Sequence, residues 1–236
     1  MKRVELLAPA GNMECLKTAL HFGADAVYIS GKRFGLRAFA ANFDEDEIKT
    51  ACDMAHGMGK KIYVTVNALM RDNELIGMRD YCKTLKDIGV DAIIVSDPGV
   101  FVIARDIIEV HLSTQASTLN SYSARFWHEM GYKRIVMARE ATLEDIRTIR
   151  KNCPEDMEIE AFVHGAMCIA FSGRCLMSSV LTGRSGNKGA CAQPCRWGYT
   201  IHEAGYPDDY FPIEQDEKGT YILNSRDLMM IEHIPE

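Results

Sequence analysis

Four cysteines lie in a stretch of the chain that follows neither a helical nor a strand pattern. They are Cys168, Cys175, Cys191 and Cys195, and six, fifteen and three residues separate them. Structural zinc sites usually pair cysteines about two to four residues apart, and only the last two approach that spacing. An iron-sulfur cluster tolerates wider spacings because it presents its corners to different loops. The spacing therefore suits a metal centre, with a cluster favoured and with zinc or ordinary thiols as alternatives.

A cysteine nucleophile is a second chemical possibility for this stretch. His164 lies four residues before Cys168 and could act as its base, since a reactive thiol needs a nearby base or positive charge. This pairing leaves the other three clustered cysteines without a role.

The other four cysteines fall in ordinary patterns. Cys15, Cys52 and Cys82 lie within helix-period stretches, where we expect them to act as small core residues. Cys153 precedes Pro154 in a connection and has no partner near it in the sequence.

Apolar, β-rich runs alternate with amphipathic stretches along most of the chain. We expect strands at residues 4–8, 26–30, 61–67, 92–96, 110–114, 134–138 and 158–163. Residues 44–58, 74–88 and 142–153 show helical periodicity between them. Helical patterns end at Gly23, Gly59, Gly89 and Gly131, which predicts left-handed C-terminal caps. Apolar strands that alternate with helices indicate a parallel sheet covered by helices.

Two fold classes fit this alternation, a doubly wound sheet and a (β/α)8 barrel. The strand spacing is regular and no G-x-G-x-x-G loop follows the first strand, so we predict a TIM-barrel-like (β/α)8 parallel barrel. Seven strands are one short, so we expect an incomplete barrel whose eighth strand lies beyond the chain end. Residues 1–164 would hold the seven βα units, 165–222 a Cys-rich insertion over the barrel mouth after strand 7, and 223–236 the start of the seventh helix.

Polar residues are expected where the strands end, because barrels of this kind do their chemistry at the carboxyl ends of the strands. Any one of them could simply cap a loop, but together they predict a polar ring around one mouth, beneath the four clustered cysteines. The ring consists of Tyr28, Ser30, Asn67, Asp97, Gln115, Arg139, Glu140 and His164. We expect Asn67, Gln115, Arg139 and His164 to converge on one cavity.

The charge distribution adds a hint about the substrate. A net charge of -6 at pH 7 argues against a general nucleic-acid binder. Residues 161–202, however, contain Arg174, Arg184, Lys188 and Arg196 and no Asp or Glu. These cations would either offset a thiolate-bound cluster or guide a phosphate or carboxylate to the mouth. Since no apolar run is long enough to span a membrane and no signal-peptide region opens the chain, we expect a cytoplasmic protein without membrane contact.

One segment carries a resemblance to a known family. EAFVHGAMCIAFSGRCLMS, residues 160–178, resembles the signature of the peptidase U32 family at every specified position. ELLAPAGN, GADAVYIS and NKGACAQPCRWGY are also similar to that family, so the resemblance covers essentially the whole chain. It implies a barrel-like catalytic domain that normally continues past the last residue of this sequence.

The resemblance also implies a cofactor and a reaction. Family members that act in anaerobic ubiquinone hydroxylation hold a [4Fe-4S] cluster on similar cysteines, which implies Cys168, Cys175, Cys191 and Cys195 as ligands, although the fourth ligand varies among branches. The stretches HGAMC and GACAQPCRW look like those of factors for wobble-uridine hydroxylation in tRNA. In that branch prephenate is implicated as the oxygen source.

We therefore predict an enzyme that supports tRNA uridine hydroxylation through an iron-sulfur centre. His164, Arg139 and Glu140 are its predicted catalytic residues. RNA and a small carboxylate are the expected substrates, and the predicted binding residues are Tyr28, Asn67, Asp97, Gln115, Arg174 and Arg196.

Two other functions stay open. The family name suggests a collagenase-like peptidase, but the chain has no G-x-S-x-G elbow and no H-E-x-x-H helix. A peptidase would therefore depend on Cys168 and His164. The other alternative is a non-catalytic subunit of a hydroxylation complex.

Overall fold

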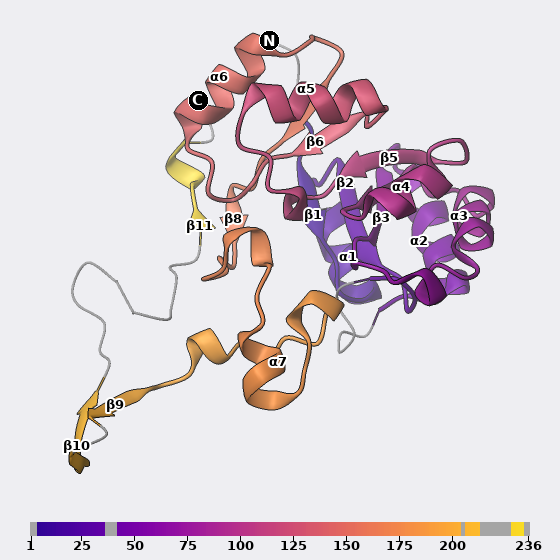
Figure 1. Ribbon diagram of the computed structural model, residues 1–236. Coiled ribbons are helices and arrows are strands. Elements are labelled where there is room, and N and C mark those ends of the chain that lie inside the picture. The colour runs from indigo at the N-terminus through magenta and orange to yellow at the C-terminus, as the bar shows by residue number, and fades with distance from the viewer. Residues whose placement is uncertain (1–3, 36–41, 204–205, 213–227, 234–236) are drawn as a thin grey trace.

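Seven parallel strands form the centre of the molecule. The computed structural model describes residues 4–35, 42–203, 206–212 and 228–233 (Figure 1). The strands pair in chain order, and every pairing among them is parallel. They are β1 (Leu7–Pro9), β2 (Ala26–Ser30), β3 (Lys61–Val66), β4 (Ala92–Val95), β5 (Glu109–Leu112), β6 (Arg134–Val136) and β7 (Glu158–Glu160). All seven overlap the predicted strands, and the parallel sheet is confirmed.

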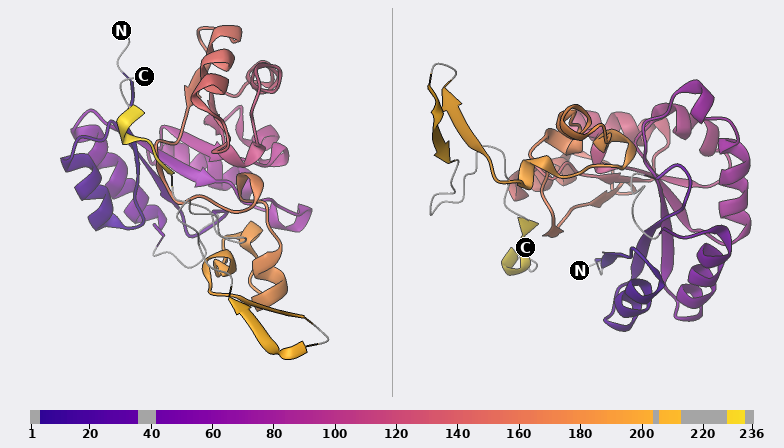
Figure 2. Two further views of the ribbon diagram at one scale, coloured as in Figure 1. Left: turned by 90° about the vertical axis from the view of Figure 1, so that its left-hand side faces the viewer. Right: turned by 90° about the horizontal axis from the view of Figure 1, so that it is seen from below.

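Helices connect these strands and cover the outer side of the curved sheet (Figure 2). They are α1 (Met13–His21), α2 (Glu45–Gly57), α3 (Met78–Asp87), α4 (Pro98–Ala104), α5 (Ser121–Met130) and α6 (Leu143–Asn152). Five of these six helices carry a side-chain cap at their start, such as Asp44 on α2 and Thr142 on α6, each in a capping box, whereas α3 begins after Gly77 without one. The predicted cap glycines have positive φ: 99° at Gly23, 67° at Gly59, 100° at Gly89 and 112° at Gly131.

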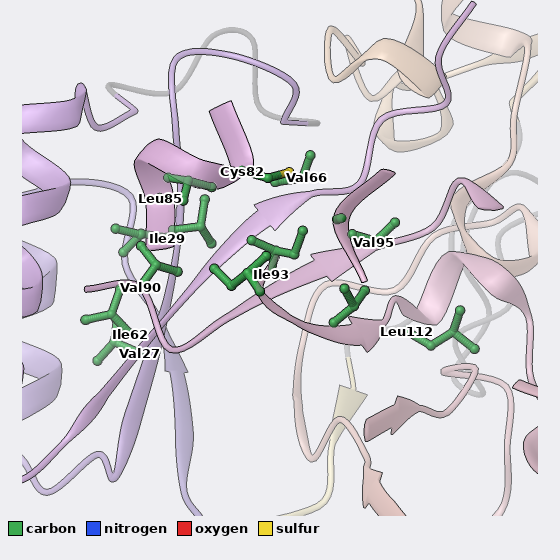
Figure 3. Close-up of a cluster of buried hydrophobic side chains, with 14 of the residues drawn as sticks. Val27, Ile29, Ile62, Val66, Cys82, Leu85, Val90, Ile93, Val95 and Leu112 are labelled. Atoms are coloured by element: carbon green, nitrogen blue, oxygen red, sulfur yellow. The ribbon is translucent and has the colours of Figure 1, made fainter. Parts of the chain in front are cut away.

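The main core lies between the strands and the helices. Apolar side chains on the outer face of the sheet, such as Val27, Ile62 and Ile93, are fully buried against the helices (Figure 3). Cys52 and Cys82 belong to this core, as predicted. The prediction for Cys15 is wrong because its side chain is exposed. On α1 the buried positions are Leu16 and Leu20, and a residue one position earlier points about 100° away from them.

The barrel is incomplete. Strands β1 and β7 are the two ends of the parallel sheet, and among the described residues no further strand joins them. The helix expected to begin within 223–236 does not appear in the described part of that range. There Leu228–Met229 form β11, which pairs antiparallel with β8 (His164–Gly165), and Ile231–His233 form a 3-10 turn. Residues 223–227 and 234–236 lie outside the described part.

In its described part, the segment after β8 contains short elements only. They are the 3-10 turn η3 (Phe171–Gly173), helix α7 (Met177–Thr182), the 3-10 turns η4 (Gly186–Lys188) and η5 (Pro194–Arg196), and strands β9 (Thr200–Glu203) and β10 (Tyr206–Pro212). The β9–β10 hairpin extends away from the parallel sheet (Figures 1 and 2). Within the described ranges, no helix is both long enough and apolar enough to span a membrane. The predicted boundaries of the Cys-rich insertion, at residues 164 and 222, stay a prediction.

Candidate active site

Two predicted site residues follow strand β6. The guanidinium of Arg139 lies 4.6 Å from the centre of the Phe162 ring, which comes from the chain just after β7. Glu140 Oε1 accepts a hydrogen bond of 2.8 Å from the backbone N–H of Ser172. Its other oxygen, Oε2, is buried and has no hydrogen-bond partner among the described residues. Glu140 therefore joins the barrel to the cysteine-containing segment and retains one unused acceptor.

The residues after β3 and β4 have different surroundings. Asn67 Oδ1 is buried and lacks a partner in the described part of the chain, while the Asn67 carbonyl accepts a 2.6 Å hydrogen bond from Ser96. Asp97 caps α4 by accepting from Gly99 N at 2.8 Å, and it also accepts from Met70 N at 2.9 Å. Each Asp97 oxygen thus holds a backbone group, which gives this residue a capping function. Its role in substrate binding stays a prediction.

Three further residues of the predicted polar ring differ in how deeply they are buried. Tyr28 is half-buried on the inner face and packs against a small apolar cluster that includes Tyr63. Gln115 is half-buried in the 3-10 turn η2 (Thr114–Ala116). His164 is exposed and belongs to β8, outside the parallel sheet, where its backbone pairs with Met229. The convergence of Asn67, Gln115, Arg139 and His164 on one cavity stays a prediction.

Backbone N–H groups donate to three of the clustered thiols. Met177 N lies 3.3 Å from Cys175 Sγ, and Gln193 N lies 3.3 Å from Cys191 Sγ. The backbone N–H of Ile169 donates to Cys195. Such bonds stabilise negative charge on sulfur, so they suit thiolates that bind a metal or a cluster.

Cys195 lies near Cys168 and Cys191 in space, and the backbone of Cys175 lies beside Cys191. Burial, and then the nearby thiols of Cys168 and Cys191, raise the pKa of Cys195. Cys175 lies near Cys191, because a Cβ on Gly186 would be 3.7 Å from Cys191 Sγ and 3.8 Å from the Cys175 carbonyl. All four are free thiols. In the described parts of the chain, no three His, Cys, Asp or Glu side chains are grouped so that they could hold a metal ion.

The donor set therefore fits a cluster in its chemistry. It consists of four free thiols, three of which accept backbone hydrogen bonds, while the described side chains do not bring three of them together for a metal ion. Zinc is the alternative that the sequence left open, and the choice between them stays a prediction.

A lysine fastens the cysteine-containing segment to the barrel. Lys188 Nζ, in η4, lies 2.5 Å from Glu74 Oε2 and 2.5 Å from the carbonyl of Leu69, both of which follow β3. Its charge lowers the pKa of Glu74 through this hydrogen bond. The sequence suggested that Lys188 could guide an anion or offset a cluster, but the structure shows that its ammonium binds a carboxylate of the barrel. Nothing in the local sequence relates these residues, which are far apart in the chain.

A second contact fastens the same segment near β6. Besides its bond to Glu140, η3 packs against η2. Within η3, Ser172 has a φ of 50°, is 2% exposed and has a buried hydroxyl without a partner among the described residues. Non-glycine residues in this conformation are strained and often mark functional sites. No sequence signal distinguishes Ser172 from an ordinary loop serine.

The interior of the barrel contains a charged network that sequence reasoning missed. Arg134 on β6 lies 2.7 Å from Glu5, 2.7 Å from Glu158 and 3.5 Å from Glu160. Tyr63 donates a 3.0 Å hydrogen bond to Glu5. Glu158 and Glu160 alternate with Ile159 in β7, and that alternation was a signal that both carboxylates face the interior.

Burial perturbs the ionisation of this network. It raises the pKa of Glu160 to about 7, and the charges of Glu5 and Glu158 act in the same direction, while Arg134 opposes them. Burial also acts to raise the pKa of Glu5, but the hydrogen bond and charge of Arg134 outweigh it and lower that pKa. The network therefore contains a carboxyl group that exchanges its proton near neutral pH.

Comparison with known proteins gives a consistent result. The model of peptidase family U32 matches residues 11–236. The chain is 44% identical over 238 residues to "tRNA hydroxylation protein P1" of Bacillus subtilis, with 100% of this chain and 56% of that protein covered. It is 42% identical over 201 residues to "23S rRNA 5-hydroxycytidine C2501 synthase" of Escherichia coli, with 85% of this chain and 30% of that protein covered. The chain thus spans about half the length of the first of these relatives and less of the second.

A solved structure supports the fold. "The Structure of the U32 Peptidase Mk0906" aligns with a TM-score of 0.58 at 16% identity and covers 70% of each chain. At that identity the likeness concerns the fold alone. The fold is TIM-barrel-like, and this chain contains seven of its parallel strands.

Proposed function

Since the chain belongs to peptidase family U32, we propose that it is the barrel part of an enzyme that hydroxylates RNA, with the wobble uridine of tRNA as the target base. The observation that carries this proposal is the 44% identity along the whole chain to a protein named for tRNA hydroxylation. A second relative is named for hydroxylation of a cytidine in ribosomal RNA, so pyrimidine bases in RNA are the shared substrate class. An RNA substrate also agrees with a cytoplasmic location.

The proposed cofactor is a [4Fe-4S] cluster bound by Cys168, Cys175, Cys191 and Cys195. The neighbouring thiols and their backbone hydrogen bonds support this assignment. When bound, such a cluster would supply single-electron transfer to the reaction.

The protein's own groups would position the cofactor segment and the substrates. Glu140, which follows β6, and Glu74, which follows β3, hold that segment through Ser172 and Lys188. Arg139, stacked on Phe162, would bind a small carboxylate co-substrate such as prephenate, the proposed oxygen donor. The unused acceptor on Glu140 would receive a hydrogen bond or a proton from the substrate.

Nucleoside analysis tests the proposal. The chain is produced in bacteria whose tRNA lacks hydroxylated wobble uridine, and the tRNA nucleosides are then measured by mass spectrometry. We expect hydroxyuridine to appear with the wild-type chain and to be absent with Cys175→Ser. Degradation of gelatin by the purified chain, with no change in the tRNA nucleosides, would instead support the peptidase that depends on Cys168 and His164.

A further inference from the structure

Two large aromatic side chains are exposed beside the clustered cysteines. Phe171 lies in η3, between Cys168 and Cys175, and is 48% exposed. Trp197 directly follows η5, the turn that contains Cys195, and is also 48% exposed. Exposed apolar side chains that gather on one surface often mark a binding site.

The chain just before η3 contacts η5. Ile169 N donates a hydrogen bond to Cys195, and the guanidinium of Arg196 lies 3.4 Å from the carbonyl of Met167. Both contacts join the chain before η3 to η5. Phe171 lies two residues after Ile169 and Trp197 directly follows Arg196, so both rings belong to short segments that flank these contacts.

The surface around these segments is also cationic. Arg174, Arg184 and Arg196 are exposed, and residues 161–202 contain no Asp or Glu. Arginine contacts phosphate groups whatever the base sequence of the nucleic acid. An exposed aromatic ring, in contrast, can stack only on a base that is not stacked on its neighbours in the strand. The combination is typical of proteins that bind unpaired nucleotides.

We propose that Phe171 and Trp197 are stacking platforms for unpaired RNA bases, and that Arg174 and Arg196 contact the flanking phosphates. The proposal rests on the proposed function and narrows it, because it requires a single-stranded target such as a loop and excludes an intact duplex as the substrate. The same surface would hold the strand beside the clustered cysteines.

Three exposed aliphatic side chains on α7 and directly before it suggest a different ligand for this surface, a protein partner. Leu176, Val180 and Leu181 are 67%, 79% and 51% exposed, and α7 packs against η5. A protein partner would bury these side chains. The concentration of arginines and the absence of acidic residues in 161–202 favour RNA, so the protein partner becomes an outcome of the test.

The test measures the binding of two RNA probes to the anaerobically prepared full chain by fluorescence anisotropy. One probe is a short hairpin with an unpaired loop, and the other is a blunt duplex of similar length. Phe171→Ala and Trp197→Ala should each weaken hairpin binding roughly 5- to 100-fold, because base stacking contributes that much, and should change duplex binding less than about twofold. Arg174→Ala should reduce the salt dependence of hairpin binding by about one phosphate contact.

The chain provides a matched control. Tyr122 on α5 is 78% exposed, and the guanidinium of Arg125 lies 4.8 Å from its ring centre. Tyr122→Ala thus removes an exposed aromatic ring with a nearby arginine at a site distant in sequence, and hairpin binding should not change. Trp197→Phe keeps a stacking surface and should retain most of the affinity, which separates lost stacking from a misfolded segment.

Three results would overturn the proposal. If the wild-type chain binds the hairpin and both alanine variants bind it equally well, the stacking platforms are wrong while RNA remains the substrate. If the wild-type chain binds neither probe, the proposed function fails as well. If Val180→Ser alters self-association in sedimentation while the aromatic variants leave RNA binding unchanged, the surface binds protein.

Discussion

The guanidinium of Arg134 lies 2.7 Å from the carboxylate of Glu5, although 129 positions separate the two residues in the chain. Glu5 precedes β1 and Arg134 opens β6, so the contact links the first part of the sheet to its last strands. Among the residues that the structure describes, no strand pairing joins β7 to β1. The ion pair therefore supplies an attachment between the two ends of the open sheet.

Removing this guanidinium should destabilise the protein strongly. Arg134→Met keeps much of the side-chain volume but leaves three carboxylates near one another without their cation. The Arg134 side chain is only 9% exposed, so we expect the free energy of unfolding to fall by about 3 to 5 kcal/mol. Urea unfolding followed by circular dichroism measures the change.

The control for this substitution is Arg147→Met on α6, where the side chain is 52% exposed and lies 3.8 Å from Glu144. An exposed pair of this kind contributes less than about 1 kcal/mol. Equal stability of the two variants would show that the interior network does not hold the open sheet together.

The pH dependence of stability should reveal the protonation of Glu160. Its pKa is about 7 in the folded protein against an ordinary value of 4.5. The folded state therefore holds this proton more tightly than the unfolded state does. The resulting stabilisation is fully present below about pH 4.5 and is lost as the pH rises through about 7.

Glu160→Gln mimics the protonated carboxyl and should remove this dependence. Relative to wild type, the variant should gain up to about 3 kcal/mol between about pH 4.5 and about pH 8, since each pKa unit corresponds to about 1.4 kcal/mol. Urea unfolding at a series of pH values provides the measurement. Glu129→Gln, an exposed change on α5, is the control. Parallel pH profiles for wild type and Glu160→Gln would mean that Glu160 does not hold a proton near neutrality.

The elements of the barrel could be predicted from sequence because their signals are local. The run from Ala26 to Ser30 is apolar and β-rich, and Gly23 ends the preceding helix, so a few adjacent residues determine the strand. The predicted run at 158–163 is longer than β7 because pairing stops at Glu160, opposite Val136, the last residue of β6. The length of a strand depends on its neighbour, which a local pattern does not contain.

The site could be predicted only in its residue types. Spacing predicts the four clustered cysteines and strand ends predict Glu140 as site residues, but the contacts that hold these residues depend on long-range packing. Lys188 lies more than a hundred positions from Glu74, and Ser172 meets Glu140 through a strained turn. Neither pairing leaves a periodic or motif signal in the sequence.

The clustered cysteines should bind iron together. We expect Cys168→Ser and Cys175→Ser to lose most of the iron and sulfide that the anaerobically purified wild-type chain retains, because each removes one of four thiolate ligands. Cys15→Ser, which changes an exposed thiol on α1, should retain both. Iron and sulfide analysis with an absorption spectrum measures the effect. Zinc without sulfide in the wild-type chain would assign the four thiols to the alternative metal instead.

Substitution of Glu140 should separate its anchoring role from its predicted catalytic role. Glu140→Ala removes the acceptor of the Ser172 N–H, so hydrogen exchange in the peptide that contains η3 should accelerate roughly 10-fold or more, since a hydrogen bond to a charged group contributes about 1.5 to 3 kcal/mol. Glu140→Gln keeps an oxygen that can accept the same bond, and exchange should remain slow. Glu144→Ala, at an exposed position on α6, controls for general loosening.

If Glu140→Gln keeps slow exchange and full iron content but loses tRNA hydroxylation, the carboxylate has a chemical role that its amide cannot replace. If exchange in Glu140→Ala matches wild type, Glu140 does not anchor the cysteine-containing segment, and its attachment depends on the Lys188 contact and on the packing of η3 against η2 instead.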